Sequence, residues 1–245
     1  MRFTWLLALF AFAACSRNGA SNNAITVAIP TNAPPVNAIA VADYAAARSP
    51  QLAKIFTPDI LGANVAYLET ITGPAFRTEA AERTYKVDGC QIVVGVEKGK
   101  IANIGVDGVS AHCSFPIAQY FAGGYDHPVP PLPSFGDIKD GLGGHYGATC
   151  LSLCGNAAAP VVWLTYSGSH ADNFNGLYAA IPITGGPALD AYEDWSAKLI
   201  AKYGQAYVEN GQYEGGDSLD DVAAKDFARV RPTLIRVGQD LPGGD

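Results

Sequence analysis

Two runs rich in β-branched residues, separated by a short polar segment, form the clearest pattern in the chain. They extend over Tyr85–Val96 and Ile101–Val106, on either side of Glu97-Lys98-Gly99-Lys100. Because side chains alternate along a strand, this pattern predicts a β-hairpin with a loop of three or four residues. The apolar positions change parity near Asp88-Gly89, for which we favour a β-bulge and keep a tight Asp-Gly turn as the alternative. On the return strand one face carries Ala102, Ile104 and Val106, with Asn103 and Gly105 opposite, so we expect helices on one face only.

Helix-start signals precede several apolar segments. Ser49-Pro50 and Asn64 each begin a short helix, and the second of these is expected to end at Gly73-Pro74. The longest helix begins at Pro187, and a last helix opens at Ser218 in a partial capping box. The apolar side of the longest helix consists of Leu189, Tyr192, Trp195, Leu199 and Tyr203.

Further strands are expected in the second half of the chain. Val161–Tyr166 and Gly176–Ile183 have the composition of two strands joined by Ser167–Asn175, and Thr233–Val237 that of a closing strand. Four prolines fall within residues 128–133, a composition typical of a polyproline II spacer. We place a domain boundary there and keep a proline-rich ligand for a partner as the alternative.

Together these elements predict an α+β protein. It consists of two small helix-on-antiparallel-sheet units after a signal peptide and a flexible tether, with a single continuous sheet as the alternative. The expected segments are a signal peptide (1–14), a lipidated tether (15–42), an N-terminal α+β domain (43–122), a Pro-rich linker (123–134) and a C-terminal α+β domain (135–245).

The N-terminus has the pattern of a secretory signal. Arg2 is followed by the apolar run Phe3–Ala14 and then by Cys15. The run is too short for a stable membrane-spanning helix, which is the alternative. Phe12-Ala13-Ala14-Cys15 resembles the bacterial lipobox, with phenylalanine where leucine is usual. The resemblance implies that Cys15 becomes the acylated N-terminus of the mature protein, and Ser16 after it implies delivery to an outer membrane.

Composition narrows the class of protein. Residues 16–40 are rich in Asn, Ala and Pro and cannot bury enough surface to fold alone, which predicts a tether. Removal of residues 1–14 takes away Arg2 and leaves 15 basic against 23 acidic residues, a net charge of −8. An acidic chain argues against binding to nucleic acid and against a polybasic membrane patch.

Four cysteines remain after Cys15. An even number in an exported chain predicts two disulfides, which four cysteines can form in three ways. We expect Cys150 to pair with Cys154 in a local loop and Cys90 with Cys113, tying the hairpin to the segment after it. A zinc site built from these four is the alternative, although one C-x3-C pair without a second is poor ligand spacing.

A second resemblance begins at Gly62. The segment Gly62-Ala-Asn-Val-Ala-Tyr-Leu-Glu-Thr-Ile-Thr-Gly-Pro74, followed by strands joined at a polar turn, is similar to small outer-membrane lipoproteins of the SmpA/OmlA (BamE) type. The likeness covers residues 62–113. It implies helices packed on a sheet and a role in binding rather than catalysis. The chain lacks the aromatic strand pattern of that family and is more than twice as long.

Candidates for chemistry are few. Ser169, His170 and Asp172 fall together in the expected loop between two strands. Residues so close in sequence seldom converge as a hydrolytic triad, so side-chain hydrogen bonds within a turn are the favoured interpretation. The run from Asp172 to Gly176 also fails the calcium-loop spacing.

Histidine and glycine patterns add no site. The four histidines, His112, His127, His145 and His170, stand apart, with no spacing that brings two nitrogens to one metal. Gly141–Gly147 misses both phosphate-binding glycine patterns and is expected to be a flexible loop. We therefore expect no metal and no cofactor.

The sequence thus predicts an exported lipoprotein of the cell envelope, facing the periplasm from the outer membrane. Its expected role is to bind an envelope or secreted protein as an adaptor, assembly factor or inhibitor, without catalysis. The alternative is a cell-envelope hydrolase that uses His170 and Asp172 with a residue from Gly136–Gly147.

Overall fold

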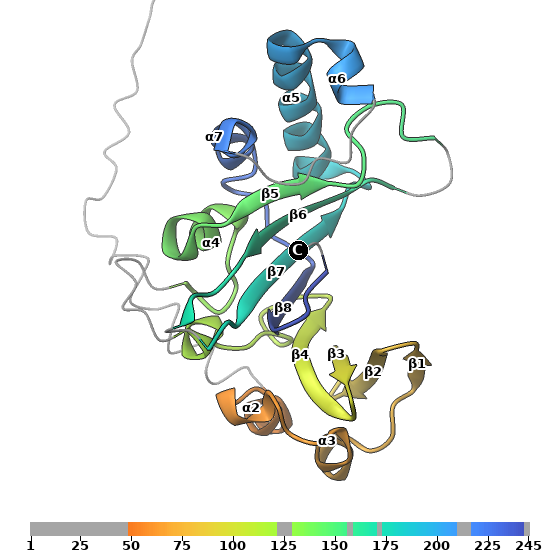
Figure 1. The fold of residues 1–245 in the computed structure, drawn as a ribbon. Helices are drawn as coiled ribbons and strands as arrows, with labels where there is room; N and C mark the ends of the chain where they lie inside the picture. Colours follow the sequence, from red (N-terminus) through yellow and green to blue (C-terminus); the bar gives the residue numbers. More distant parts are fainter. Residues whose placement is uncertain (1–48, 122–128, 156–158, 171–172, 210–216, 243–245) are drawn as a thin grey trace, which may run out of the picture. The chain divides into compact units, whose positions relative to one another are not determined.

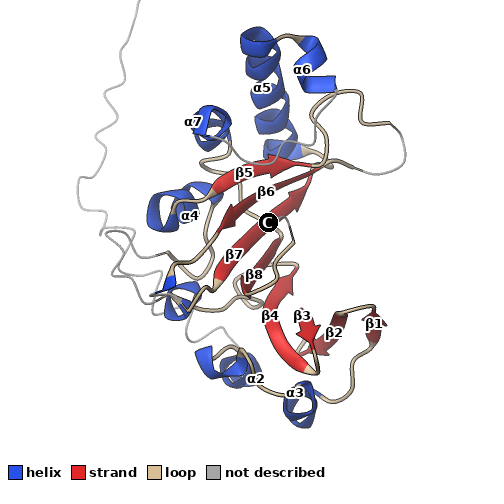
Figure 2. Cartoon of the chain, viewed as in Figure 1, coloured by secondary structure: helices blue, strands red, loops and turns tan. Residues whose placement is uncertain are grey.

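Eight strands form one antiparallel sheet in the computed structural model, which describes residues 49–121, 129–155, 159–170, 173–209 and 217–242 (Figures 1 and 2). The strands are β1 (Arg77–Glu79), β2 (Glu82–Val87), β3 (Cys90–Glu97), β4 (Lys100–Asp107), β5 (His145–Ala148), β6 (Val161–Tyr166), β7 (Gly176–Pro182) and β8 (Leu234–Gly238). The helices are α2 (Pro50–Ile55), α3 (Val65–Thr72), α4 (Phe135–Leu142), α5 (Gly186–Tyr203), α6 (Gln205–Glu209), α7 (Asp217–Asp226) and the short 3-10 helices η1 (Pro58–Ile60) and η2 (Ile117–Tyr120).

Strand β8 joins the two halves of the chain, because the order across the sheet is β1-β2-β3-β4-β8-β7-β6-β5. It pairs with β4 on one side and β7 on the other, and Figure 1 shows it in dark blue between them. The α+β class is confirmed. The two expected units are halves of one continuous sheet, which was the alternative. Residues 123–128 of the expected Pro-rich linker lie outside the described residues. Since β4 and β8 lie far apart in sequence, no local pattern could specify their pairing.

Tight turns define the hairpins. Val87 pairs with Cys90, and Asp88 and Gly89 between them have φ values of 49° and 83°. The favoured bulge at this place was therefore wrong, since a two-residue turn with both φ values positive closes β2 and β3 directly. Lys98-Gly99 forms the second such turn, shorter than expected, and the register shift lies instead at Gly95/Val96.

The expected helix starts at Ser49 and Asn64 are confirmed, whereas Ser218, expected to open the last helix, lies inside α7. Ser49 accepts hydrogen bonds from the first turn of α2, and Asn64 caps α3, which ends at Gly73 with a φ of 77°. Helix α5 begins one residue before Pro187, and its side chains Tyr192, Trp195 and Leu199 are buried as expected.

The register divides the sheet into two faces, because residues directly opposite in antiparallel strands point to the same side. One cross-strand row, nowhere more than 1% exposed, consists of Tyr85, Ile92, Val106, Ile235, Ala179, Leu164 and Tyr146. Helices contact this apolar face at both ends. The Tyr85 hydroxyl donates to Glu69 of α3, and the Tyr146 ring packs near Phe135 of α4 and Phe227 after α7.

The opposite side, which we call the glycine face, is different. It carries all five glycines of the described strands, namely Gly95, Gly105, Gly147, Gly176 and Gly238. Figure 2 shows β5 to β8 with no helix drawn in front of them. Helix packing on one face of the sheet agrees with the alternation of apolar and polar positions in β4.

The segment Gly141–Gly147 is not a flexible loop, contrary to expectation. It contains the end of α4 and the start of edge strand β5. Gly143 and Gly144 between them have φ values of 84° and 97°, and a Cβ on Gly144 would lie 2.2 Å from the Thr165 carbonyl oxygen. The glycines thus permit a sharp helix-to-strand turn in close contact with β6.

Both expected disulfides are present. Cys90 is bonded to Cys113, and Cys150 to Cys154. Within the described residues, no helix combines the length and apolar character needed to cross a bilayer. Cys15 and the segment around it lie outside these residues, so the lipobox expectation stays a prediction.

Candidate functional site

The loop between β6 and β7 holds the residues first considered for chemistry. Asp172 lies outside the described residues. Ser169 and His170 are exposed, and their carbonyl oxygens accept hydrogen bonds from the amides of Phe174 and Asn173, at 3.0 and 3.1 Å. The His170 ring packs edge-on against Phe174, with 5.4 Å between ring centroids. Main-chain hydrogen bonds and this ring contact therefore shape the loop.

Phe174 has an unusual conformation for its size. Asn173 and Phe174 have φ values of 54° and 58°, a left-handed region that bulky side chains rarely adopt. The Phe174 side chain is nevertheless 62% exposed, and it lines a groove of about 470 Å³ with Tyr166 and Leu177. Gln239 lines this groove and a second one of about 500 Å³, and its side chain donates to the Asn173 carbonyl.

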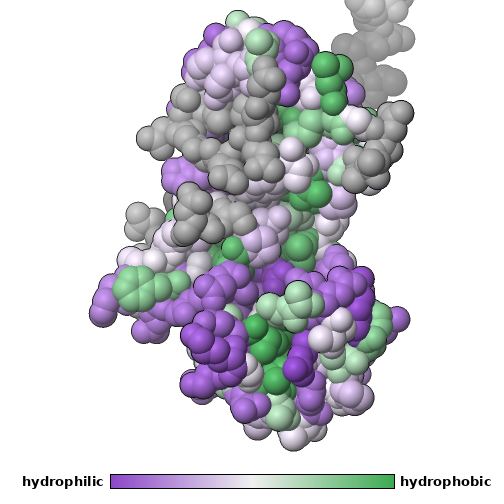
Figure 3. Space-filling model, turned by 45° about the vertical axis from the view of Figure 1, so that its right-hand side comes forward, coloured by the Kyte–Doolittle hydropathy of each residue, from purple (hydrophilic) through white to green (hydrophobic). Residues whose placement is uncertain are grey.

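Other large apolar side chains on the described surface are Tyr67, Phe76, Leu153 and Tyr207. Leu153 also has a positive φ of 51°, but it lies within the five-residue loop closed by the Cys150–Cys154 disulfide, which constrains it. Figure 3 shows hydrophilic residues around a small hydrophobic patch on the lower part of the molecule, where α2, α3 and β1–β4 lie.

A buried carboxylate meets a histidine at the edge of the sheet. Asp220 of α7 is 4% exposed, and its Oδ2 lies 2.6 Å from Nδ1 of His145 at the start of β5. Its Oδ1 accepts the backbone amide of Tyr146 at 2.7 Å, and Lys139 of α4 lies 3.3 Å from Oδ2. Asp220 thus links one strand and two helices through charge-assisted hydrogen bonds.

This arrangement has a chemical consequence. In the tautomer of the neutral ring that places the proton on Nδ1, this proton points at the carboxylate and Nε2 of His145 is an acceptor. The His145 side chain is 56% exposed, so Nε2 has access to solvent. Such a dyad can transfer protons, but catalysis also requires a nucleophile or water beside a bound substrate.

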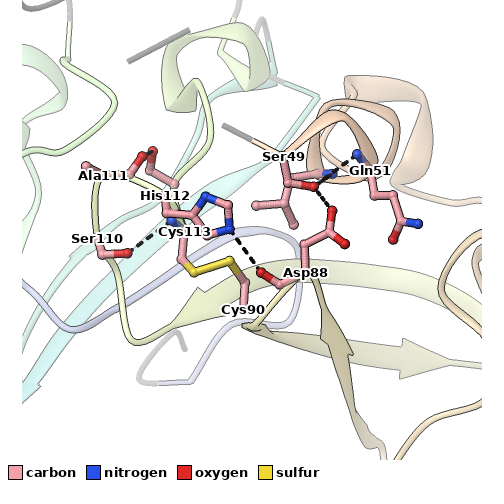
Figure 4. The surroundings of a disulfide bond; sticks show 10 residues. Ser49, Gln51, Asp88, Cys90, Ser110, Ala111, His112 and Cys113 are labelled. Carbon is pink, nitrogen blue, oxygen red and sulfur yellow. Dashed lines mark hydrogen bonds between the residues drawn. A yellow bond between two sulfur atoms is a disulfide. The ribbon is translucent and has the colours of Figure 1, made fainter. Parts of the chain in front are cut away.

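A second serine, histidine and aspartate lie near the first disulfide (Figure 4). The Ser49 hydroxyl donates to the Asp88 carboxylate and accepts the amide of Gln51 at 3.1 Å. His112 Nε2, however, lies 3.0 Å from the backbone oxygen of Asp88. The His112 ring thus contacts the main chain of Asp88 while its carboxylate holds Ser49, so this cluster fixes the start of α2 to the β2–β3 turn.

On the glycine face, flat side chains lie against glycines of neighbouring strands. A Cβ added to Gly147 would lie 2.4 Å from Cε2 of Trp163, and one on Gly105 would lie 2.6 Å from Cγ of Arg236. Asn103 occupies the same space at Gly95, 2.4 Å from such a Cβ. Glycine is required at these positions because any side chain would displace its neighbour.

Arg236 organises the centre of this face. Its side chain is 6% exposed, and its NH1 donates to Glu82 at 2.7 Å. Its Nε donates to the Asn103 side chain at 3.1 Å. The adjacent Tyr178 is 8% exposed, and burial raises the pKa of its hydroxyl while the Arg236 charge opposes the rise. A groove of about 430 Å³ runs beside Glu82, Asn103 and Arg236.

Sequence reasoning missed both polar clusters. The partners of Asp220 and Arg236 come from strands and a helix that are distant in sequence, so only the fold brings them together. One signal was available for the glycine face, since Asn103 and Gly105 alternate with the apolar residues of β4. Among the described residues, no group of three or more His, Cys, Asp or Glu side chains is arranged to hold a metal ion.

No family model matches the sequence, no curated protein matches it, and no solved structure matches its fold.

Proposed function

We propose that this protein is an exported lipoprotein, anchored through Cys15, that binds another envelope or secreted protein without catalysing a reaction. The lipobox and the Asn-, Ala- and Pro-rich segment 16–40 support the anchor and tether. Two disulfides support an oxidising compartment, since such bonds persist there. The outer membrane, with the body facing the periplasm, is the proposed location.

The observation that carries the binding role is Phe174. A large apolar side chain in a left-handed conformation costs free energy and gains little from burial when it is 62% exposed. Strain of this kind persists where the surrounding structure imposes it, and it concentrates at functional sites. A few well-packed side chains supply most of the binding energy of a protein interface, and the position of Phe174 beside a groove suits this role.

Cross-linking and affinity capture of the mature, membrane-tethered protein test this proposal. A Cys15→Ala variant, which cannot be lipidated, separates partners that require anchoring from those that do not. Phe174→Asn keeps the left-handed backbone, which asparagine tolerates, and removes the anchor. We expect this variant to lose the cross-linked partner at unchanged thermal stability.

Leu153→Asn is the matched control, since Leu153 is also exposed and left-handed but lines neither groove beside Phe174. It should retain the partner. If Phe174→Asn captures the partner as well as the parent protein and Leu153→Asn do, the proposed interface is ruled out. The absence of any specific partner for the parent protein would also rule it out.

A second candidate is a cell-envelope hydrolase, which the 2.6 Å contact between His145 and Asp220 favours. The sequence suggested His170 and Asp172 for this activity. Among the described residues, the histidine and aspartate in contact are instead His145 and Asp220. Hydrolysis of ester and amide substrates that is lost in His145→Gln would support it. Activity that survives His145→Gln would exclude this dyad as its source.

A further inference from the structure

Two grooves at one end of the sheet are continuous with each other. Asp240 and Leu241 line both the groove of about 470 Å³ beside Phe174, which we call the Phe174 groove, and the groove of about 430 Å³ beside Arg236. The loops that border the two grooves lie at the same end of the sheet, because β3, β6 and β8 all end there. A partner segment that contacts Phe174 can therefore extend into the second groove.

The second groove, which we call the carboxylate groove, combines an apolar lining with a rim of acidic side chains. Its apolar lining includes Val96 and Leu241. Its carboxylates belong to Glu79, Glu82, Glu97 and Asp240. Arg236 is the one cationic side chain among the described residues that line it, and this side chain is 6% exposed and bonded to Glu82 at 2.7 Å. The groove therefore has an excess of negative charge.

Two further cations lie beside these carboxylates without lining the groove. Lys98 lies 2.8 Å from Glu97, and Arg77 lies 3.6 Å from Glu79. The side chains of Lys98 and Arg77 are 87% and 50% exposed. Ion pairs as exposed as these contribute little to stability. The carboxylates of Glu79 and Glu97 are therefore available to a cation that enters the groove.

The chain segment that carries Asp240 is held firmly in place. The Asn103 side chain, from a residue that is 2% exposed, donates to the carbonyl oxygens of Gln239 and Asp240 at 2.8 and 3.0 Å. The Gln239 amide donates to the Ala102 carbonyl at 2.8 Å. Asp240 itself has a φ of 50°, an uncommon value for a residue other than glycine. Because this wall is ordered before a ligand arrives, binding has less conformational entropy to overcome.

Lysine and arginine side chains have the complementary chemistry. Their methylene stems pack on apolar surface while the cationic head stays at a polar rim. An acidic segment would instead meet like charges. We propose that the protein partner of the Phe174 groove presents a basic segment whose lysine or arginine side chains occupy the carboxylate groove. This inference rests on the proposed protein-binding function and specifies the chemistry of the partner.

Peptides that differ in charge alone measure this preference. The probes are three peptides of equal length, each with a leucine and a phenylalanine separated by lysine, by serine or by glutamate residues, and each carrying the same dye. Their binding to the full chain from residue 15 on, kept soluble by Cys15→Ala, is followed by fluorescence anisotropy. We expect the lysine peptide to bind about tenfold more tightly than the serine peptide at about 50 mM salt, and the difference to shrink at about 200 mM. The glutamate peptide should bind most weakly.

A double variant locates the site. Asp240→Asn keeps the left-handed backbone, which asparagine tolerates, and Glu97→Gln removes a second charge. Together they should weaken binding of the lysine peptide about five- to tenfold at low salt and leave the serine peptide unchanged. The matched control combines Asp190→Asn with Asp221→Asn, which removes two exposed carboxylates that line neither groove. The control should bind the lysine peptide as the parent does.

Several results would overturn the proposal. One is equal affinity for the lysine and serine peptides, which would make the grooves an apolar site without charge selection. Others are tighter binding of the glutamate peptide and no binding of the lysine peptide up to about 1 mM. Equal weakening by the double variant and its control would mean that only the net charge of the chain matters. A dimer of the chain that Phe174→Asn dissociates would assign the grooves to a second copy instead.

Capture of the cellular partner separates this inference from the proposed function on which it rests. If Phe174→Asn abolishes capture while the double variant of Glu97 and Asp240 captures the partner unchanged, the basic segment is excluded and the protein interface stands. Loss of capture in both variants, with retention in the matched control, would support both.

Discussion

Replacement of Asp220 tests how the helices are held to the edge of the sheet. The carboxylate is 4% exposed and accepts from the Tyr146 amide at 2.7 Å, from His145 at 2.6 Å and from Lys139 at 3.3 Å. In Asp220→Ala the buried Tyr146 amide and the His145 side chain lose this carboxylate as a partner. Lys139 keeps only its hydrogen bond to the Gly144 carbonyl. We expect a clear loss of stability.

The magnitude follows from the exposure of each donor. A hydrogen bond from a buried amide to a charged acceptor contributes about 2 kcal/mol. His145 is 56% and Lys139 25% exposed, so solvent screens both contacts and each contributes about 0.5 kcal/mol. Asp220→Ala should therefore lower the free energy of unfolding by about 3 kcal/mol. Asp220→Asn, which can still accept the Tyr146 amide, should lose about half of this amount.

Equilibrium denaturation with the disulfides intact, followed by tryptophan fluorescence, measures both losses. The matched control is Asp221→Ala, which removes an exposed carboxylate at the neighbouring position of α7. Because both changes remove one negative charge from the same part of the helix, their difference isolates the contacts of Asp220. Equal losses for the two variants would refute the reasoning, and so would a loss below about 0.5 kcal/mol for Asp220→Ala.

Three further outcomes follow from the structure. Removing the Cys90–Cys113 disulfide should cost about 3 kcal/mol and removing Cys150–Cys154 about 2 kcal/mol, because the sequence separations are 23 and 4; denaturation of the two double alanine variants checks the order. Gly147→Ala should lift the Trp163 ring and cost about 1–3 kcal/mol, with a shift of tryptophan emission that an unchanged spectrum would contradict. Burial and nearby carboxylates raise the pKa of Tyr146, so the free energy of unfolding should fall as the pH rises above about 10, where the unfolded tyrosine ionises first. Absorbance near 295 nm would show a phenolate that forms only at higher pH than the other tyrosines. If the same late ionisation is present in Tyr146→Phe, it does not belong to Tyr146.

Local elements could be predicted from the sequence because their signals are local. Ser49 and Asn64 cap helices by bonding to amides two or three residues ahead, and this requires nothing from the rest of the chain. The position of β8 had no such signal, although its residues were recognised as a strand. Alternation identifies a strand and its two faces, but not its neighbours, so the same sequence was compatible with two separate sheets or one.

The parity change before β3 shows a different limit. A bulge and a two-residue turn at Asp88-Gly89 both reverse the apolar parity, and both accept glycine with a positive φ. The two differ in whether the chain continues or reverses, which depends on partners for Tyr85 and Val87 across the sheet. These partners are Ile92 and Cys90, which the sequence already showed as apolar residues of the next strand. A turn there pairs them on one face, and this favours the turn on packing grounds alone.

The polar clusters around Asp220 and Arg236 could not be predicted from the sequence, for a physical reason. A buried carboxylate such as Asp220 cannot be told from its exposed neighbour Asp221 by type or helical position, because its burial depends on donors from β5 and α4. Glycine is more informative. A glycine inside a strand has no side chain to pack, and it loses more backbone entropy on folding than other residues do. When several glycines point to the same face of a sheet, other contacts on that face must offset this loss of stability. Gly95 and Gly105 already met this condition in the sequence, and the compensation is the close contact of Asn103 and Arg236. A glycine face of this kind can therefore be predicted from a sequence before its fold is known, whereas the side chains that cover its glycines depend on which strands pair.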